Sequence, residues 1–326
     1  MKKSFSLFAF GIGILSSTIG FSDGTPSQPS PSLLPYWVRG DFIYAQMREG
    51  RLQFATKPES STGIFDPSKE HLLSPHFAWE FDFRLQAGRS WENVTVFLNW
   101  SHFTGKAHRK LKTSYENQFF PVWNLRDDIF TQDFAQQSKI HWSNTVDFID
   151  LASQLNLVKV PQYFQLQSRL ALRTGWGNQS VHVDYSQGIF VGGADRVRMS
   201  SHNWGLGPLL GLDVEVMMPQ GFSIPISVAG TSFFSQFHTH QKETYLDEVA
   251  ADWSRRSWKT QWILDVSAAL QWKKRFDSCS LSLSAGYEFH ELWGENNFSQ
   301  NRLGLLSGLS RSLFISGVSG SMRIDF

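Results

Sequence analysis

Strict alternation of apolar and polar side chains is the feature that most constrains this chain. The clearest segment is 77–88, where aromatic or aliphatic residues occupy every second position. Its polar positions hold Glu80, Asp82, Arg84 and Gln86. A helix has a period of 3.6 residues and would mix the two sets, whereas a strand separates them onto two faces. The segment therefore predicts a β-strand with one apolar and one polar face.

The same pattern recurs along the chain and predicts an all-β fold of about ten strands. The predicted strands are 36–46, 77–88, 93–104, 139–151, 164–173, 203–216, 221–234, 258–273, 279–291 and 312–326. Their connections alternate between long (47–76, 105–138, 176–202, 235–257, 292–311) and short (89–92, 217–220, 274–278) or medium (152–161). An even number of strands with long and short connections in alternation is typical of antiparallel up-and-down barrels in outer membranes.

Composition helps to decide whether the apolar face points to a core or to lipid. Charged residues make up 18% of the chain and aromatic residues 15%, yet the mean hydropathy is only −0.26. A soluble β-sandwich or barrel shows the same alternation, so the pattern alone leaves both open. In 258–273, however, tryptophans stand at both ends, with aliphatic residues between them. This is the placement of aromatic girdles at two membrane interfaces, and it favours a transmembrane barrel.

The N-terminus predicts export. Lys2 and Lys3 precede an apolar run over 5–15, and the small residues Gly20 and Ser22 fit a cleavage site. The run is too short to remain as an anchor helix. We therefore expect a cleaved signal peptide over 1–22, a flexible N-terminal segment over 23–35, and an outer-membrane β-barrel with long external loops over 36–326. In that arrangement both termini are periplasmic.

The last predicted strand carries a second targeting signal. Phe326, Ile324 and Met322 alternate with Asp325 and Arg323 at the end of the sequence. Outer-membrane barrels commonly end in an aromatic residue preceded by apolar residues at alternate positions. We expect this segment to be the signal for the barrel-assembly machinery, and to pair with the first strand so that no edge is left in lipid.

Several segments together resemble a known family. They are 36–52, the hairpin 81–104, Asn203–Pro208 with Gly211–Asp213, and Leu283–His290. This combination resembles the pore-forming major-outer-membrane-protein-like family of chlamydiae and Legionella, over most of 36–326. The resemblance implies a porin-like role. Some chlamydial members are rich in cysteine and cross-linked, whereas this chain has only Cys279, which argues against such cross-links here.

The polar face predicts the lining of a pore. The pore-lining candidates are Arg39, Asp41, Glu80, Asp82, Arg84, Arg169, Arg173, Asp213, Lys259, Asp265, Glu288 and Arg323. A lining of mixed sign biases which ions and small solutes diffuse through. Eight strands leave a lumen filled by side chains and sixteen leave a water channel, so ten leaves both states open. The predicted function is a porin-like channel. The alternative is an adhesin or structural envelope barrel with an occluded lumen that binds through its loops.

Other classes of function have less support. The net charge of +1 argues against a nucleic-acid partner. His238 and His240 are too few ligands for a metal site, and no motif calls for a cofactor. An outer-membrane protease would need acidic and His–Asp pairs, for which Asp127, Asp128 and either histidine are candidates without a supporting motif. We expect no enzyme.

The expected partners follow from the location. They are membrane lipid and lipopolysaccharide, which the basic run 107–112 would meet, the assembly machinery, and small solutes or ions. A host surface is a further partner for the loops, which hold Phe119, Phe120, Trp123, Phe130 and Trp253.

Overall fold

The computed structural model describes residues 35–50, 52–58, 70–113, 119–123, 135–160, 163–188, 190–295, 298 and 312–326. The predicted signal peptide 1–22 and residues 23–34 of the flexible segment lie outside them. Within the described ranges, no helix is both long and apolar enough to cross a membrane.

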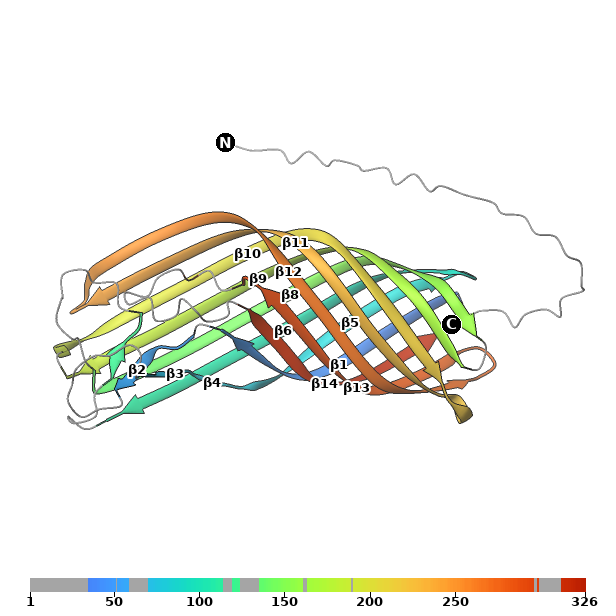
Figure 1. The fold of residues 1–326 in the computed structure, drawn as a ribbon, viewed down its shortest axis with the longest axis horizontal. Coiled ribbons are helices and arrows are strands. Elements are labelled where there is room, and N and C mark those ends of the chain that lie inside the picture. The colour runs from blue at the N-terminus through green and yellow to red at the C-terminus, as the bar shows by residue number, and fades with distance from the viewer. Residues whose placement is uncertain are drawn as a thin grey trace, which may run out of the picture. The chain divides into compact units, whose positions relative to one another are not determined.

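Ten antiparallel strands pair in chain order and close into a ring (Figure 1). The ring consists of β1 (Tyr36–Glu49), β5 (Trp79–Ser90), β6 (Val94–Lys112), β8 (Gln137–Val160), β9 (Phe164–Gln187), β10 (Phe190–Met217), β11 (Phe222–Tyr245), β12 (Glu248–Arg275), β13 (Ser280–Trp293) and β14 (Leu313–Asp325). The short strand β4 (His76–Phe77) pairs with β6 just before β5 begins. The ring confirms the predicted all-β barrel of about ten antiparallel strands.

Exposed aromatic side chains form two belts on the outside of the ring. One belt lies at the end of the barrel where β1 begins and β14 ends, which is called here the terminal end. It includes Tyr36, Trp91, Phe164, Phe222 and Phe326. The second includes Tyr44, Trp176, Trp204, Phe234 and Trp262. Exposed Leu and Val residues lie between them. From Phe164 to Trp176 a strand rises about 40 Å, or about 28 Å after a tilt near 45°, which matches the hydrocarbon thickness of a bilayer.

Beyond the second belt, at the end called here the hairpin end, the strands continue much further than predicted. Strands β8 to β12 have 24–28 residues each. The expectation of long loops over 176–202 and 235–257 was therefore wrong. Both regions are strand up to tight turns, in which Gln187, Gly188, Leu246 and Asp247 have positive φ. Buried and exposed side chains still alternate through these regions, but the outer face carries polar residues in place of apolar ones. A pattern that expects apolar residues on the outer face therefore does not identify these strands.

The wall of the barrel is uneven at the hairpin end. Strand β12 pairs with β11 from Glu248 onwards, but with β13 only from Trp262 onwards. Within the described residues, the stretch 248–261 therefore has a strand partner on one side alone. Strands β6 and β8 to β12 form a tall wall there, and β1, β13 and β14 form a short one.

A second, small sheet lies against the interior of this wall. It consists of β2 (Ala55–Pro58), β3 (Glu70–Leu73) and β7 (Phe120–Pro121), from the β1–β5 and β6–β8 connections. With the neighbouring residues 52–54, 122 and 123, it is called here the inserted sheet. Its apolar residues belong to the same buried cluster as inward-facing residues of the barrel strands. Two of the predicted long loops thus carry a structure that packs within the barrel.

The ring closes where β1 meets β14. The two strands are paired from Trp37–Asp325 to Glu49–Leu313. Beyond that register, Tyr36 and Phe326 exchange backbone hydrogen bonds of 3.1 and 2.8 Å, and their rings stack at 6.5 Å between centroids. Phe326 and Met322 are exposed on the outer face with half-buried Ile324, as the alternation predicted. A role of these residues in assembly stays a prediction.

The seam provides a test of closure, because one glycine on β14 lies directly against β1. A Cβ at Gly317 would lie 2.3 Å from the Tyr44 carbonyl oxygen, whereas a Cβ at Gly320 meets nothing within 4 Å. We expect Gly317→Val to lower the free energy of unfolding by about 3 kcal/mol or to prevent folding, because the seam backbone must move. Gly320→Val is the matched control and should fold normally. Urea titration of refolded protein, followed by tryptophan fluorescence, measures both; equal stability of the two variants would contradict the seam geometry.

Candidate functional site in the barrel interior

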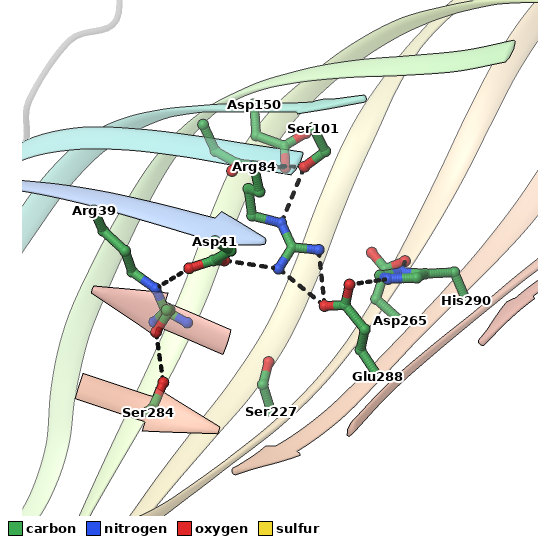
Figure 2. A network of polar contacts seen from close by, with 12 residues as sticks. Arg39, Asp41, Arg84, Ser101, Asp150, Ser227, Asp265, Ser284, Glu288 and His290 are labelled. Atoms are coloured by element: carbon green, nitrogen blue, oxygen red, sulfur yellow. Dashed lines mark hydrogen bonds and ion pairs between the residues drawn. The ribbon is translucent and has the colours of Figure 1, made fainter. Parts of the chain in front are cut away.

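A network of charged side chains crosses the barrel interior (Figure 2). Along the strands it lies between the positions of the two aromatic belts. Arg84 on β5 contacts Asp41 on β1 at 3.1 Å and Glu288 on β13 at 3.0 Å. Strands β1 and β14 separate β5 from β13 in the ring. The contact between Arg84 and Glu288 therefore passes through the interior and does not follow the wall.

A second arm of the network starts from β9. Arg173 contacts Asp150 on β8 and Asp265 on β12, each at 2.7 Å. The Nδ1 atom of His290 lies 2.8 Å from Asp265, and its Nε2 atom lies 3.8 Å from Glu288. His290 therefore joins the two arms, and the network links strands from opposite parts of the ring.

The network leaves little free charge to act on a passing ion. Arg39, which contacts Asp41 at 2.6 Å, brings the number of arginines to three. They face four carboxylates: Asp41, Asp150, Asp265 and Glu288. Except on Arg39, these side chains are at most 15% exposed. Breaking a buried pair by removing one partner typically costs about 3–5 kcal/mol, so the contacts fix the strands relative to one another.

The predicted pore-lining residues fall into separate groups in the structure. Six of the twelve belong to the network: Arg39, Asp41, Arg84, Arg173, Asp265 and Glu288. Three others lie nearer the terminal end. There Arg169 pairs with Asp213, and Arg323 pairs with Asp325 at 2.6 Å while covering the Trp37 ring.

The remaining three predicted residues stay apart from both groups. Buried Asp82 accepts hydrogen bonds from the backbone and hydroxyl of Thr104. Glu80 lies 3.3 Å from exposed Lys106. Lys259 lies over the ring of Phe237, near the hairpin end.

Two important features of the interior escaped the prediction. Asp150 pairs with Arg173 but was not among the candidates, although it shares a face with Phe148 and Ala152 and alternation places it inside. The second feature is an apolar section beyond the network. No signal in a single strand reveals that section, because its inward-facing apolar residues are spread over nine strands of the ring.

The apolar section excludes water. Its barrel residues include Ile43, Phe103, Phe148, Ile263 and Ile315, none more than 5% exposed. The inserted sheet continues this section. Phe54 and Trp123 are 0% and 1% exposed, and the Tyr185 hydroxyl on β9 donates to the Phe54 carbonyl oxygen at 2.5 Å. A continuous aqueous channel would leave its lining exposed, so the barrel is sealed at this level.

Several acidic groups, among them Glu49, are enclosed in the sealed region. Glu49, at the end of β1 and beyond the second aromatic belt, accepts hydrogen bonds from Gln179 and from the Trp142 indole nitrogen at 3.1 Å. Burial raises the pKa of Glu49 to about 8, against the lowering effect of the Gln179 hydrogen bond; nearby Glu295 raises it further. Glu49 is therefore mostly protonated at neutral pH.

The candidate catalytic and metal-binding groups do not assemble into a site in the described residues. His238 and His240 lie on the outer face of β11, where His240 contacts Asp252 at 2.8 Å. Asp127 and Asp128 lie outside the described residues. The described part of the chain holds no cluster of three or more His, Cys, Asp or Glu residues suited to a metal ion.

Comparison with solved structures returns outer-membrane proteins at low identity. The chain is 9% identical to the outer membrane protease OmpT from Escherichia coli, with 92% of this chain and 100% of that chain covered and a TM-score of 0.41. It is 12% identical to the translocator domain of the autotransporter NalP from Neisseria meningitidis, with 89% and 88% covered and a TM-score of 0.32. For the toluene transporter TodX from Pseudomonas putida the identity is 6%, the coverage 91% of both chains and the TM-score 0.26. No curated protein matches.

A family model gives the decisive comparison. The model described as Legionella pneumophila major outer membrane protein precursor matches residues 35–304. The match spans most of the chain and nearly the whole of the barrel described above. Together with the closed ring of ten strands and its two aromatic belts, it shows that this chain is an outer-membrane β-barrel protein that belongs to the Legionella major outer membrane protein family.

Proposed function

We propose that this chain works as a sealed outer-membrane barrel that acts through its hairpin end, and not as a permanently open diffusion pore. The observation that carries the proposal is the dry apolar section, where the inserted sheet and the barrel wall pack with almost no exposed surface. In this proposal the terminal end faces the periplasm, the tall hairpins face the exterior, and no reaction is catalysed. The hairpins then form an adhesive or structural surface.

The free energy of packing supports a stable seal. If the inserted sheet left the barrel, Leu52, Phe54, Val122 and Trp123, all at most 1% exposed, would become accessible to water. Each such side chain contributes about 2 kcal/mol through burial, or on the order of 8 kcal/mol together. At about 1.4 kcal/mol per factor of ten, spontaneous opening would involve about one molecule in a million.

A porin-like channel for ions and small solutes is the second candidate, in a gated form. It is favoured by the mixed-sign network, since rings of charged side chains select ions in many pores. For solutes to pass, the inserted sheet would have to withdraw, and pairs such as Arg84–Glu288 would have to separate. In this form the barrel alternates between the sealed state and a conducting one.

Planar-bilayer recording separates the two candidates. We expect folded wild-type protein to show no unit conductance steps. The double variant Phe54→Ala, Trp123→Ala should remain silent if the barrel is a permanent seal, although each truncation should cost about 3–5 kcal/mol of stability. A gated channel would instead open more often in this variant, because the inserted sheet has lost its anchors.

Phe81→Ala is the matched control, since Phe81 is 80% exposed on the outer face and contributes nothing to the seal. Steady conductance steps from properly folded wild-type protein would sink the sealed-barrel proposal. Folding is checked in each sample by the change in electrophoretic mobility on heating.

The buried acid gives a second prediction. Because the pKa of Glu49 is about 8 in the folded protein, above its usual 4.5, the folded state holds a proton that the unfolded chain releases. The contribution of Glu49 to stability is therefore fully present below about pH 4.5 and is lost as the pH rises to about 8. We expect Glu49→Gln to flatten this decline in urea titrations between about pH 5 and pH 9. Glu92→Gln, at an exposed turn, is the control; if it flattens the decline equally, Glu49 is not the responsible group.

A further inference from the structure

Histidines are concentrated on one outer surface of the tall wall. The chain has 10 histidines, and seven face outward from β4 or the tall strands beyond the second aromatic belt: His76, His108, His141, His182, His202, His238 and His240. They alternate with the buried residues of each strand, so their side chains point away from the barrel interior. The sealed interior described above makes no use of them.

Four of these histidines form one continuous row across four strands. His76 pairs with His108, His108 with His141, and His141 with His182. The row continues through Arg198, which pairs with His182, and Lys242, which pairs with Arg198. These six residues are called here the histidine row. Register partners have Cβ atoms about 5 Å apart, and the rings of His108 and His141 lie 6.4 Å apart.

The surroundings of the row are mainly basic. The next register positions toward the hairpin tips hold Lys110, Lys139 and Arg196, with the acidic residue Asp184. Toward the membrane lie Lys106, which contacts Glu80, and His240, which contacts Asp252. Asp252 also pairs in register with Lys242, and exposed Asp247 contacts Arg196. Partial burial lowers the pKa of His141, and the neighbouring Lys139 and His108 lower it further.

The height of the row above the membrane indicates what it meets. His182 lies six residues beyond Trp176 of the second aromatic belt on the same strand. Six residues rise about 20 Å along a strand, or about 15 Å after tilt. If the hairpins face the exterior, this is the level of the phosphorylated sugars that lie outside the lipid chains in the outer leaflet. Phosphate oxygens accept charge-assisted hydrogen bonds from Arg, Lys and protonated His.

We propose that the histidine row is a pH-dependent binding surface for the phosphate groups of lipopolysaccharide. At neutral pH, Arg198, Lys242 and their basic neighbours hold the phosphates. Imidazole rings that are protonated at lower pH add positive charges in line with them, and binding becomes tighter. The barrel thereby binds the lipopolysaccharide of its own membrane more tightly at low pH.

Binding of purified lipopolysaccharide to the detergent-refolded mature chain tests the proposal. We expect the dissociation constant to fall by about tenfold from about pH 7.5 to about pH 5.5. In the triple variant His108→Gln, His141→Gln, His182→Gln, the change should be less than about twofold, with the affinity at the higher pH preserved. The double variant Arg198→Gln, Lys242→Gln should weaken binding at both pH values. His71→Gln, an exposed histidine of β3 outside the row, is the matched control and should behave as wild type.

Two further arms identify the ligand. Enzymatically dephosphorylated lipopolysaccharide should bind at least about tenfold more weakly than the intact form at the lower pH. Equal binding of the two forms, or an unchanged pH response in the triple variant, would overturn the proposal. A soluble sulfated polysaccharide that binds more tightly than lipopolysaccharide would also overturn it, because the partner would then not be the membrane itself. None of these measurements depends on conductance, so the proposed function and this inference fail separately.

Discussion

The absence of water from the hydrocarbon layer is the constraint on which the whole structure depends. Every backbone N–H and C=O group at that depth needs a partner within the protein, and an unpaired strand edge there costs several kcal/mol per group. Pairing of β14 with β1 removes the last edge, and it succeeds only because residues such as Gly317 allow the two backbones to approach. The exposed aromatic belts and the aliphatic band between them are consistent with this closure, since a closed ring can present its whole outer face to lipid.

Closure then determines what the interior must do. Ten strands enclose a space that is narrow enough for side chains from opposite walls to touch, as Arg84 and Glu288 do. Charges placed there lose most of their hydration, so they are found in pairs. Further along, apolar side chains of the barrel strands and the inserted sheet fill most of the space. The interior thus has a polar section at membrane depth and an apolar section beyond it, the reverse of a water-filled pore with a selective mouth.

Much of the fold could be predicted from alternation, because lipid imposes apolar residues on one face of each spanning strand. The ten strands, their pairing order and the inward direction of Asp41, Arg84 and Arg173 all follow from that single pattern. Outside the membrane the solvent no longer imposes it, and the strands over 176–202 and 235–257 resembled loops because polar residues occupy their outer face. The seal could not be predicted, because it depends on segments such as 52–58 and 119–123 meeting Tyr185, more than 60 residues away in sequence. The sequence also did not reveal the histidine row. Its members are separated by connections of irregular length, and only the register between neighbouring strands brings them side by side.

The uneven wall has a consequence of its own. Above the second aromatic belt the cylinder becomes an open sheet, and the stretch 248–261 of β12 is its border within the described residues. Free strand borders invite other chains to add to them, and proteins commonly guard them with charge. This border holds Glu248, Asp252, Arg255, Arg256 and Lys259 among its 14 residues. Two neighbouring copies in one membrane would present these charges to one another. Because charged side chains hold their water of hydration, they would oppose pairing of the two strand borders and so aggregation of the barrels.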